Sequence, residues 1–195
     1  MYRKFFKRFF DIIFSLILLP EMLIIVVFTA PFIYFSDRGN IFYIAKRRGR
    51  NGKVFDMLKL RTMRKNAPEL RNADGSVYTG KDDARVTKVG KLLRRCSLDE
   101  LPQILNVLKG DMSFIGPRPH LATTDYESLD ERRKKRLTVR PGITGYSQAY
   151  YRNSVDMDVK IEHDCYYAEN VSLALDLKII FKTVGTVIKG KGVNG

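Results

Sequence analysis

Cysteine is scarce in this sequence, and its scarcity excludes two classes of protein. The chain has 195 residues but only two cysteines, Cys96 and Cys165, too few for a disulfide-dense secreted scaffold. They do not form a CxxC pair of the kind that binds zinc or works in redox exchange. With seven prolines and fourteen glycines, the chain is also neither collagen-like nor of low complexity.

Acidic residues are in deficit. Asp and Glu total 21 against 35 Lys and Arg, which leaves a formal net charge of +14. Hydrophobic residues make up 45% of the chain, too many for a disordered protein, and charged residues make up 29%, too many for a protein that crosses a membrane repeatedly. The positive charge is compatible with nucleic acid, anionic lipid or phosphorylated small molecules as partners.

The one long apolar run lies near the N-terminus, at residues 9–35. As a straight helix it would be about 40 Å long, against a hydrocarbon core of about 30 Å. Pro20 removes a backbone donor in its middle, and Glu21 would place a carboxylate near the bilayer centre at a cost of about 2.5–3.5 kcal/mol. Both flanks are basic, whereas a spanning helix should show this excess on one side only. We therefore predict a re-entrant hairpin that breaks at Pro20, with both ends cytoplasmic; a single span and a signal peptide are the alternatives.

The rest of the chain is soluble in character and predicts an α+β fold that is small and mainly helical. A short β-hairpin is predicted over residues 41–44 and 53–60, with its turn at 49–52. Helices are predicted over residues 86–95, from 97, over 124–137 and over 172–188, whereas 155–161 fits a strand or a helix and 65–83 a loop. The expected domains are the membrane hairpin, residues 1–37, and a cytosolic domain, residues 38–195.

The densest cluster of candidate functional residues surrounds Asp99 and Glu100. Ser97 and Glu100 have the spacing of a capping box, which by itself indicates only the start of a helix. Arginines lie on either side of the acid pair, however, and a helix start offers N–H groups to phosphate oxygens. A carboxylate there can act as a nucleophile or hold Mg²⁺, while Lys or Arg neutralises a transferring phosphoryl group. The cluster therefore favours phosphoryl chemistry.

Several longer blocks of the chain carry a family resemblance. They are Lys59–Met63, Arg85–Gly90, Ser97–Gln103, Asn106–Pro119, Arg140–Gly145, Asp164–Tyr167 and Asp176–Lys178. Together they resemble the bacterial sugar transferases, the monotopic phosphoglycosyl transferases that make polyprenyl-phosphate-linked sugars. The resemblance covers nearly the whole chain and is most specific from Ser97 to Pro119.

The resemblance implies a reaction and its residues. A member would transfer sugar-1-phosphate from a UDP-sugar to polyprenyl (undecaprenyl) phosphate at the cytoplasmic face of the bacterial inner membrane, releasing UMP and requiring Mg²⁺. The family's acid dyad falls on Asp99 and Glu100, so that Asp99 would form a covalent phosphosugar-aspartate and both carboxylates are metal-ligand candidates. The substrate-binding candidates are Lys59, Arg61, Arg85, Arg94, Arg118, Arg140 and Gln148. Pro20 matches the helix-breaking proline of the family, whereas Leu19 and Tyr146 depart from its pattern.

Two other functions remain open on the sequence. A membrane-tethered basic module would use the run Arg132–Arg136 for anionic lipid or nucleic acid, although no RNP, zinc-finger or helix-turn-helix pattern is visible. A nucleotide-sugar pyrophosphatase would use water in place of the lipid phosphate. We expect a UDP-sugar, polyprenyl phosphate and membrane lipid as partners, and no nucleic acid. The sugar, the glycan pathway and the oligomeric state, a homodimer included, are not specified.

Overall fold

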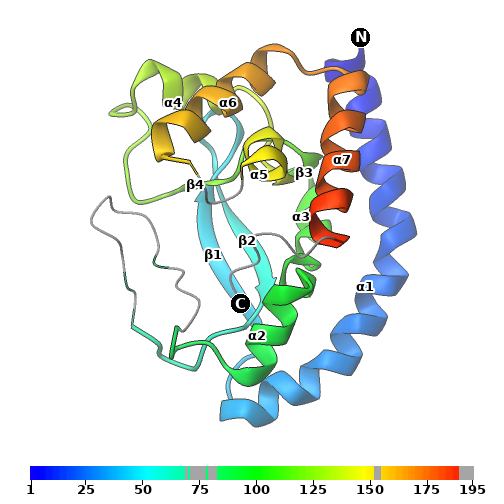
Figure 1. The fold of residues 1–195 in the computed structure, drawn as a ribbon, viewed down its shortest axis with the longest axis vertical. Helices are drawn as coiled ribbons and strands as arrows, with labels where there is room; N and C mark the ends of the chain where they lie inside the picture. The colour runs from blue at the N-terminus through cyan, green and yellow to red at the C-terminus, as the bar shows by residue number, and fades with distance from the viewer. Residues whose placement is uncertain (69, 71–77, 79–82, 152–154, 189–195) are drawn as a thin grey trace.

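The computed structural model describes residues 1–68, 70, 78, 83–151 and 155–188. It is a mixed fold, 56% helical, in which helices lie on both sides of a β-hairpin (Figure 1). The α-helices are α1 (Lys7–Asp37), α2 (Lys88–Arg95), α3 (Gln103–Lys109), α4 (Glu131–Arg136), α5 (Tyr146–Tyr150), α6 (Met157–Glu169) and α7 (Leu173–Ile188). The strands are β1 (Phe42–Arg48), β2 (Val54–Leu60), β3 (Ser113–Ile115), β4 (His120–Leu121) and β5 (Gly142–Thr144). Short helical turns are η1 (Tyr2–Phe6), η2 (Arg50–Gly52) and η3 (Leu98–Glu100).

The predicted hairpin is confirmed as the antiparallel pair β1–β2, with Phe42 opposite Leu60. β1 is longer than the predicted first strand and continues to Arg48. Its C-terminal end also pairs with β4, on the edge opposite β2. The turn uses left-handed backbone at Asn51 (φ 55°) and Gly52 (φ 78°). Asparagine and glycine tolerate this conformation at little cost, which explains why these residues close the hairpin.

The apolar N-terminal segment is one helix. α1 continues as an α-helix through Pro20 and Pro31, so the structure does not confirm the predicted break at Pro20. Figure 1 shows α1 curving along its length, so that its C-terminal end lies near α2. The segment Tyr2–Asp37 is long and apolar enough to cross a membrane, and only 11% of its most apolar window is buried. It is therefore not a core helix of the described fold.

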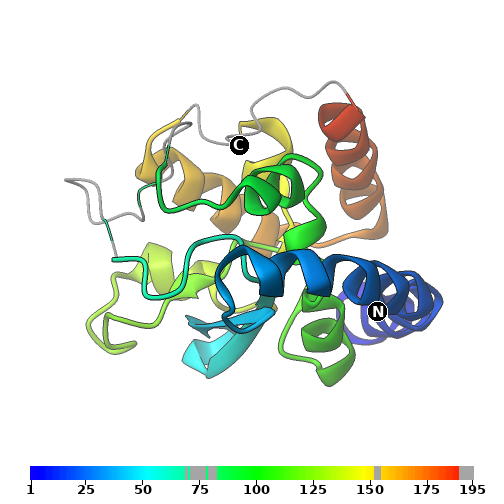
Figure 2. The ribbon, with the colours of Figure 1, turned by 90° about the horizontal axis from the view of Figure 1, so that it is seen from below.

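Residues near both ends of α1 are bonded to the rest of the fold. Near its N-terminus, the Arg8 guanidinium donates to the carbonyl oxygens of Val107 and Leu108 at 2.5 and 2.7 Å. At its C-terminus, Asp37 forms an ion pair of 2.6 Å with Arg61. In both views α1 and α7 occupy one side of the molecule (Figures 1 and 2). Exposed apolar side chains of α7, including Leu177 and Phe181, extend the apolar surface there.

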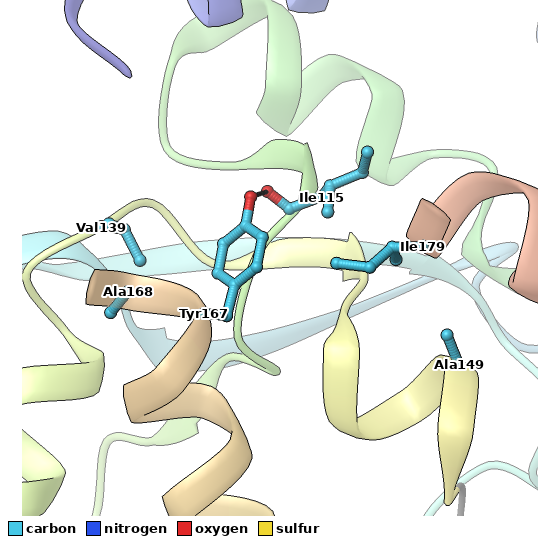
Figure 3. Close-up of a cluster of buried hydrophobic side chains, with 6 residues drawn as sticks. All are labelled: Ile115, Val139, Ala149, Tyr167, Ala168 and Ile179. Carbon is cyan, nitrogen blue, oxygen red and sulfur yellow. Dashed lines mark hydrogen bonds between the residues drawn. The ribbon is translucent and has the colours of Figure 1, made fainter. Parts of the chain in front are cut away.

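The main apolar cluster lies between the β3–β5 pair and the C-terminal helices, as Figure 3 shows. Its buried members are Ile115, Val139, Ala149, Tyr167, Ala168 and Ile179. The Tyr167 hydroxyl lies 3.1 Å from the Ile115 carbonyl oxygen and 2.7 Å from Asp176. Asp176 also pairs with Lys7 at 2.7 Å. This network joins the start of α1 to α6 and α7.

Two predicted helix starts are wrong. Ser97 accepts no capping hydrogen bond and has a left-handed backbone (φ 57°), so the chain makes the turn η3 before α3 begins at Gln103. The helix predicted over residues 124–137 is confined to α4, because Asp130 accepts the Arg133 N–H at 2.7 Å and caps the helix there. The ambiguous residues 155–161 lead into the helix α6. The predicted loop at 65–83 falls largely outside the described residues.

Candidate active site

Asp99 and Glu100 lie in η3, the turn between α2 and α3, where Asp99 is 9% exposed. The position of this turn is set by Asn106 in α3. Its side chain accepts the Leu58 N–H at 3.0 Å and donates to the Asp56 carbonyl oxygen at 2.8 Å. These two bonds tie α3 to the backbone of β2, so that η3 lies against the end of this strand.

Lys59 of β2 reaches Glu100. Its Nζ atom lies 2.6 Å from Glu100 Oε1, and the two side chains are only 18% and 26% exposed. Burial acts to raise the pKa of Glu100, but the charges of Lys59 and Arg118 and the hydrogen bond from Lys59 outweigh it and lower this pKa. Glu100 is therefore held as a carboxylate.

The pKa of Asp99 is shifted in the opposite direction, upward. Burial raises its pKa, Glu100 raises it further, and Lys59 and Arg94 act against the rise. A carboxylate with poor hydration and raised basicity is a better nucleophile than a solvated one. The two adjacent acids therefore differ in character, with Asp99 suited to attack and Glu100 to carry a constant negative charge.

Arg94 is positioned by close packing of α2 on the segment after β2. Its Nε atom donates to the Thr62 hydroxyl at 2.9 Å. Gly90 permits the close approach, since a Cβ atom there would lie 2.0 Å from the Thr62 carbonyl oxygen. Thr87 caps the helix by accepting the Gly90 N–H at 2.9 Å.

Arg118 lies on a loop that is locked by backbone contact between two motifs. The Gly116 N–H donates to the Thr144 carbonyl oxygen at 2.9 Å, and the Gly142 N–H donates to the Pro117 carbonyl oxygen at 3.0 Å. A Cβ atom on Gly142 would lie 2.1 Å from the Gly116 nitrogen. Gly116 and Gly142 are therefore needed for the two loop backbones to come into contact. This contact fixes the backbone position from which the Arg118 side chain extends.

A buried ion pair that the sequence analysis missed supports the same loop. Arg136 donates to the Arg118 carbonyl oxygen at 2.9 Å and pairs with Asp164 at 2.5 Å. In the sequence Arg136 is one of five consecutive basic residues, and nothing in that run distinguishes it. Asp164 lies in one of the family-like blocks, which is the only sequence signal for this pair.

Two of the predicted substrate-binding arginines, Arg85 and Arg61, form bonds within the protein. All three guanidinium nitrogens of Arg85 donate within the protein, to Asp83 at 2.6 and 2.9 Å and to the carbonyl oxygens of Pro68 and Tyr78 at 2.8 and 3.1 Å. Arg61 pairs with Asp37 of α1. Arg85 is therefore bonded to Pro68, Tyr78 and Asp83, and Arg61 is bonded to the C-terminal end of α1.

The remaining two predicted substrate-binding residues, Arg140 and Gln148, also form bonds within the protein. The Nε atom of Arg140 donates to the Gly110 carbonyl oxygen at 2.9 Å, and its charged neighbours are Arg8, Arg50 and Asp11. Gln148 donates to the Ile143 carbonyl oxygen at 3.3 Å, and its buried Oε1 has no protein partner within the described residues. The cations that act on the acid pair are thus Lys59, Arg94 and Arg118.

The acid pair fits only one type of metal site. Within the part of the chain that the structure describes, no group of three or more His, Cys, Asp and Glu side chains could hold a metal ion. Mg²⁺ is commonly bound by one or two carboxylates together with substrate phosphates. Asp99 and Glu100 suit an ion that arrives with a phosphorylated substrate, not one held by the protein alone.

An acid pair with three cations acting on it, together with a long exposed apolar helix, is consistent with a membrane-associated protein that handles phosphorylated substrates. The family model described as bacterial sugar transferase matches residues 2–190. The chain therefore belongs to the bacterial sugar transferase family and is a transferase, as its motif blocks indicate.

Several curated relatives are similar over almost all of this chain. It is 40% identical to the uncharacterized sugar transferase EpsL of Bacillus subtilis over 96% of this chain and 89% of that protein. It is 38% identical to the exopolysaccharide production protein ExoY of Sinorhizobium fredii, over 95% and 87%. It is 41% identical to the UDP-glucose:undecaprenyl-phosphate glucose-1-phosphate transferase of Klebsiella pneumoniae, over 92% of this chain but 39% of that protein.

Proposed function

We propose that this protein transfers sugar-1-phosphate from a UDP-sugar to polyprenyl phosphate, with Asp99 as the nucleophile. The observation that carries the proposal is the buried Asp99 carboxylate, with its raised pKa, beside Lys59 and Arg94. The name of the Klebsiella relative specifies a UDP-sugar donor and an undecaprenyl-phosphate acceptor, and supports the same pair of substrates here. The long exposed helix α1 suits an enzyme whose acceptor is a lipid.

In the first half-reaction, Asp99 attacks the β-phosphorus of the UDP-sugar. The new Asp99–phosphorus bond forms as the bond from this phosphorus to the bridging oxygen breaks, and UMP leaves with the electron pair. Lys59, Arg94 and Arg118 neutralise charge on the phosphates as they approach a buried carboxylate. Glu100 holds the Lys59 ammonium in place by their 2.6 Å ion pair.

In the second half-reaction, a phosphate oxygen of the polyprenyl phosphate attacks the same phosphorus. The bond to Asp99 breaks, the carboxylate is regenerated and the sugar leaves as polyprenyl diphosphate sugar. Asp99 and Glu100 would hold Mg²⁺ together with the phosphates, and this ion supplies additional neutralisation of their charge. The burial of Asp99 limits access of water to the phosphosugar-aspartate, which favours transfer over hydrolysis.

The test is to capture the covalent intermediate. The purified full chain, with Mg²⁺ and each of a panel of UDP-sugars but no lipid, should release about one equivalent of UMP and gain the mass of one phosphosugar. Asp99→Asn should abolish both signals. The control is Asp56→Asn, which changes a half-exposed carboxylate on β2 and should leave both signals intact. The panel also identifies the sugar.

Two results would count against the mechanism. If Asp99→Asn keeps the activity, the covalent step is wrong for this chain. If UMP release continues at full rate without polyprenyl phosphate, water is the acceptor and the protein is a nucleotide-sugar pyrophosphatase.

We further propose that α1 enters the cytoplasmic face of the bacterial inner membrane and returns to it. Arg8 and Asp37, near the two ends of this helix, are both bonded to the same domain, and a domain on one side of the bilayer cannot hold both ends of a spanning helix. The basic residues on both flanks support a cytoplasmic position for each end.

Single-cysteine labelling tests this placement. In a Cys96→Ser/Cys165→Ser background, Phe5→Cys and Asn40→Cys each place a thiol on an exposed residue outside the central part of the helix. A membrane-impermeant maleimide added to intact spheroplasts should label neither, and should label both after permeabilisation. Labelling of one site but not the other in intact spheroplasts would show a spanning helix.

A further inference from the structure

A basic pocket of about 440 Å³ lies beside the N-terminal end of α1. Basic residues dominate its lining, and no lining residue is acidic: Arg3, Lys4, Arg8, Arg50 and Arg140. They come from η1, α1, η2 and the segment after α4, so the pocket exists only in the folded chain. None of the cations that act on the acid pair lines it. It is therefore a separate site from the one around Asp99.

The positive charge of this pocket is compensated only in part by the protein. None of its basic side chains forms an ion pair with a carboxylate of the described residues. Burial lowers the pKa of Arg140, and so do the neighbouring charges of Arg50 and Arg8. The nearby Asp11, which is 4% exposed, is a single carboxylate that acts on both Arg8 and Arg140. Its Oδ1 also accepts hydrogen bonds from the Ser113 hydroxyl and the Phe114 N–H. A bound anion would remove this repulsion between cations.

Two of the arginines are already oriented before any ligand binds. Arg8 is anchored on the carbonyl oxygens of Val107 and Leu108, and Arg140 on that of Gly110. The two terminal nitrogens of Arg140 donate to no acceptor among the residues that the structure describes. A planar guanidinium with free terminal N–H groups matches the oxygens of a phosphate, and its fixed orientation reduces the entropy lost on binding.

The position of the pocket indicates where that phosphate comes from. Arg3 and Lys4 are followed in the chain by Phe5 and Phe9, which are 64% and 48% exposed. Lys and Arg at the end of an exposed apolar helix are typical of the level of the lipid head groups, where anionic phosphates attract them. We propose that this pocket binds the phosphate of an anionic phospholipid head group. The proposal uses the membrane association of α1 but not the transfer reaction.

The test measures lipid binding instead of activity. The full chain in detergent is titrated with phosphatidylglycerol and analysed by native mass spectrometry, with phosphatidylcholine as the zwitterionic comparison. The test variant is Arg3→Gln/Arg50→Gln, because both residues are exposed and neither anchors α3. The control is Lys88→Gln/Lys91→Gln, which removes the same charge from exposed positions of α2. Circular dichroism confirms that each variant is folded.

The wild type should retain phosphatidylglycerol in preference to phosphatidylcholine. The Arg3/Arg50 variant should bind phosphatidylglycerol about tenfold more weakly, since each basic contact near a membrane surface contributes on the order of a fewfold to tenfold in affinity, while the Lys88/Lys91 control changes little. Equal losses in the two variants would mean diffuse attraction and would overturn the proposal. Displacement of the lipid by an equal concentration of inorganic phosphate would assign the site to a soluble ion, and would also overturn it.

Discussion

Replacing Lys59 with methionine should move the acidic limb of the pH–rate profile to higher pH. Methionine keeps much of the length of the side chain but removes the ammonium that lies 2.6 Å from Glu100. Burial acts to raise the pKa of both Asp99 and Glu100, although the pKa of Glu100 is lowered overall, and Lys59 is the first of the charges that oppose burial in each case. Without Lys59 both pKa values rise, so that the nucleophilic carboxylate is lost to protonation at a higher pH.

The size of this shift follows from the burial of the pair. An opposite charge at this range lowers the pKa of a carboxyl by about 1–3 units. Because Lys59 and Glu100 are 18% and 26% exposed, solvent screens part of the interaction, and we expect a smaller upward shift of the acidic limb than for a fully buried pair. Losing one cation that faces the phosphates should also reduce the rate at the optimum by about 10²-fold. The first effect is a shift along the pH axis and the second a vertical drop, so one profile separates them.

The assay is UMP release in the presence of polyprenyl phosphate, measured from about pH 5 to pH 9 as in a standard acid–base analysis. The same β-hairpin offers a matched control in the pair Lys46–Asp56, which is 3.0 Å long but 74% and 53% exposed. Lys46→Met should leave the profile unchanged, because such exposed pairs contribute only about 0–1 kcal/mol. If Lys59→Met lowers the rate but leaves the acidic limb in place, Lys59 does not control the protonation of the acid pair and our account of their pKa values is wrong.

Two further predictions concern the support of the Arg118 loop. Gly142→Ala should destabilise the fold by about 2 kcal/mol or more, because its Cβ would lie 2.1 Å from the Gly116 nitrogen. Gly185→Ala, in α7 with nothing within 4 Å of the new atom, should instead stabilise the protein by up to about 1 kcal/mol; equal melting temperatures would contradict the proposed backbone contact. Arg136→Met should lower the free energy of unfolding by about 3–5 kcal/mol at neutral pH, because it leaves Asp164 buried without its partner. Burial already raises the pKa of Asp164, so the deficit should shrink as the pH falls and Asp164 is protonated in the folded state. Denaturant unfolding at pH 7 and at about pH 5 checks this sign, and a deficit that does not shrink would argue against it.

Local patterns in the sequence predict much of this fold. The apolar run of α1, the strands of the hairpin and the helices α2 and α7 all follow from composition and periodicity over a few residues. The errors occur where one residue competes with a longer pattern. Ser97 adopts a left-handed backbone instead of capping a helix, and Asp130 starts α4 later than the run of charged residues suggests.

The sequence by itself determined the family, the acid pair and the membrane-type helix, because each depends on residues that are adjacent or regularly spaced in the chain. Only the tertiary structure decided which basic residues serve that pair. Arg61, Arg85, Arg94 and Arg118 are chemically equivalent in sequence, but Arg61 faces Asp37 and Arg85 faces Asp83. A guanidinium binds a carboxylate, a carbonyl oxygen or a phosphate with the same N–H groups. Its role is therefore set by the neighbours that folding brings to it, and these lie far away in the sequence.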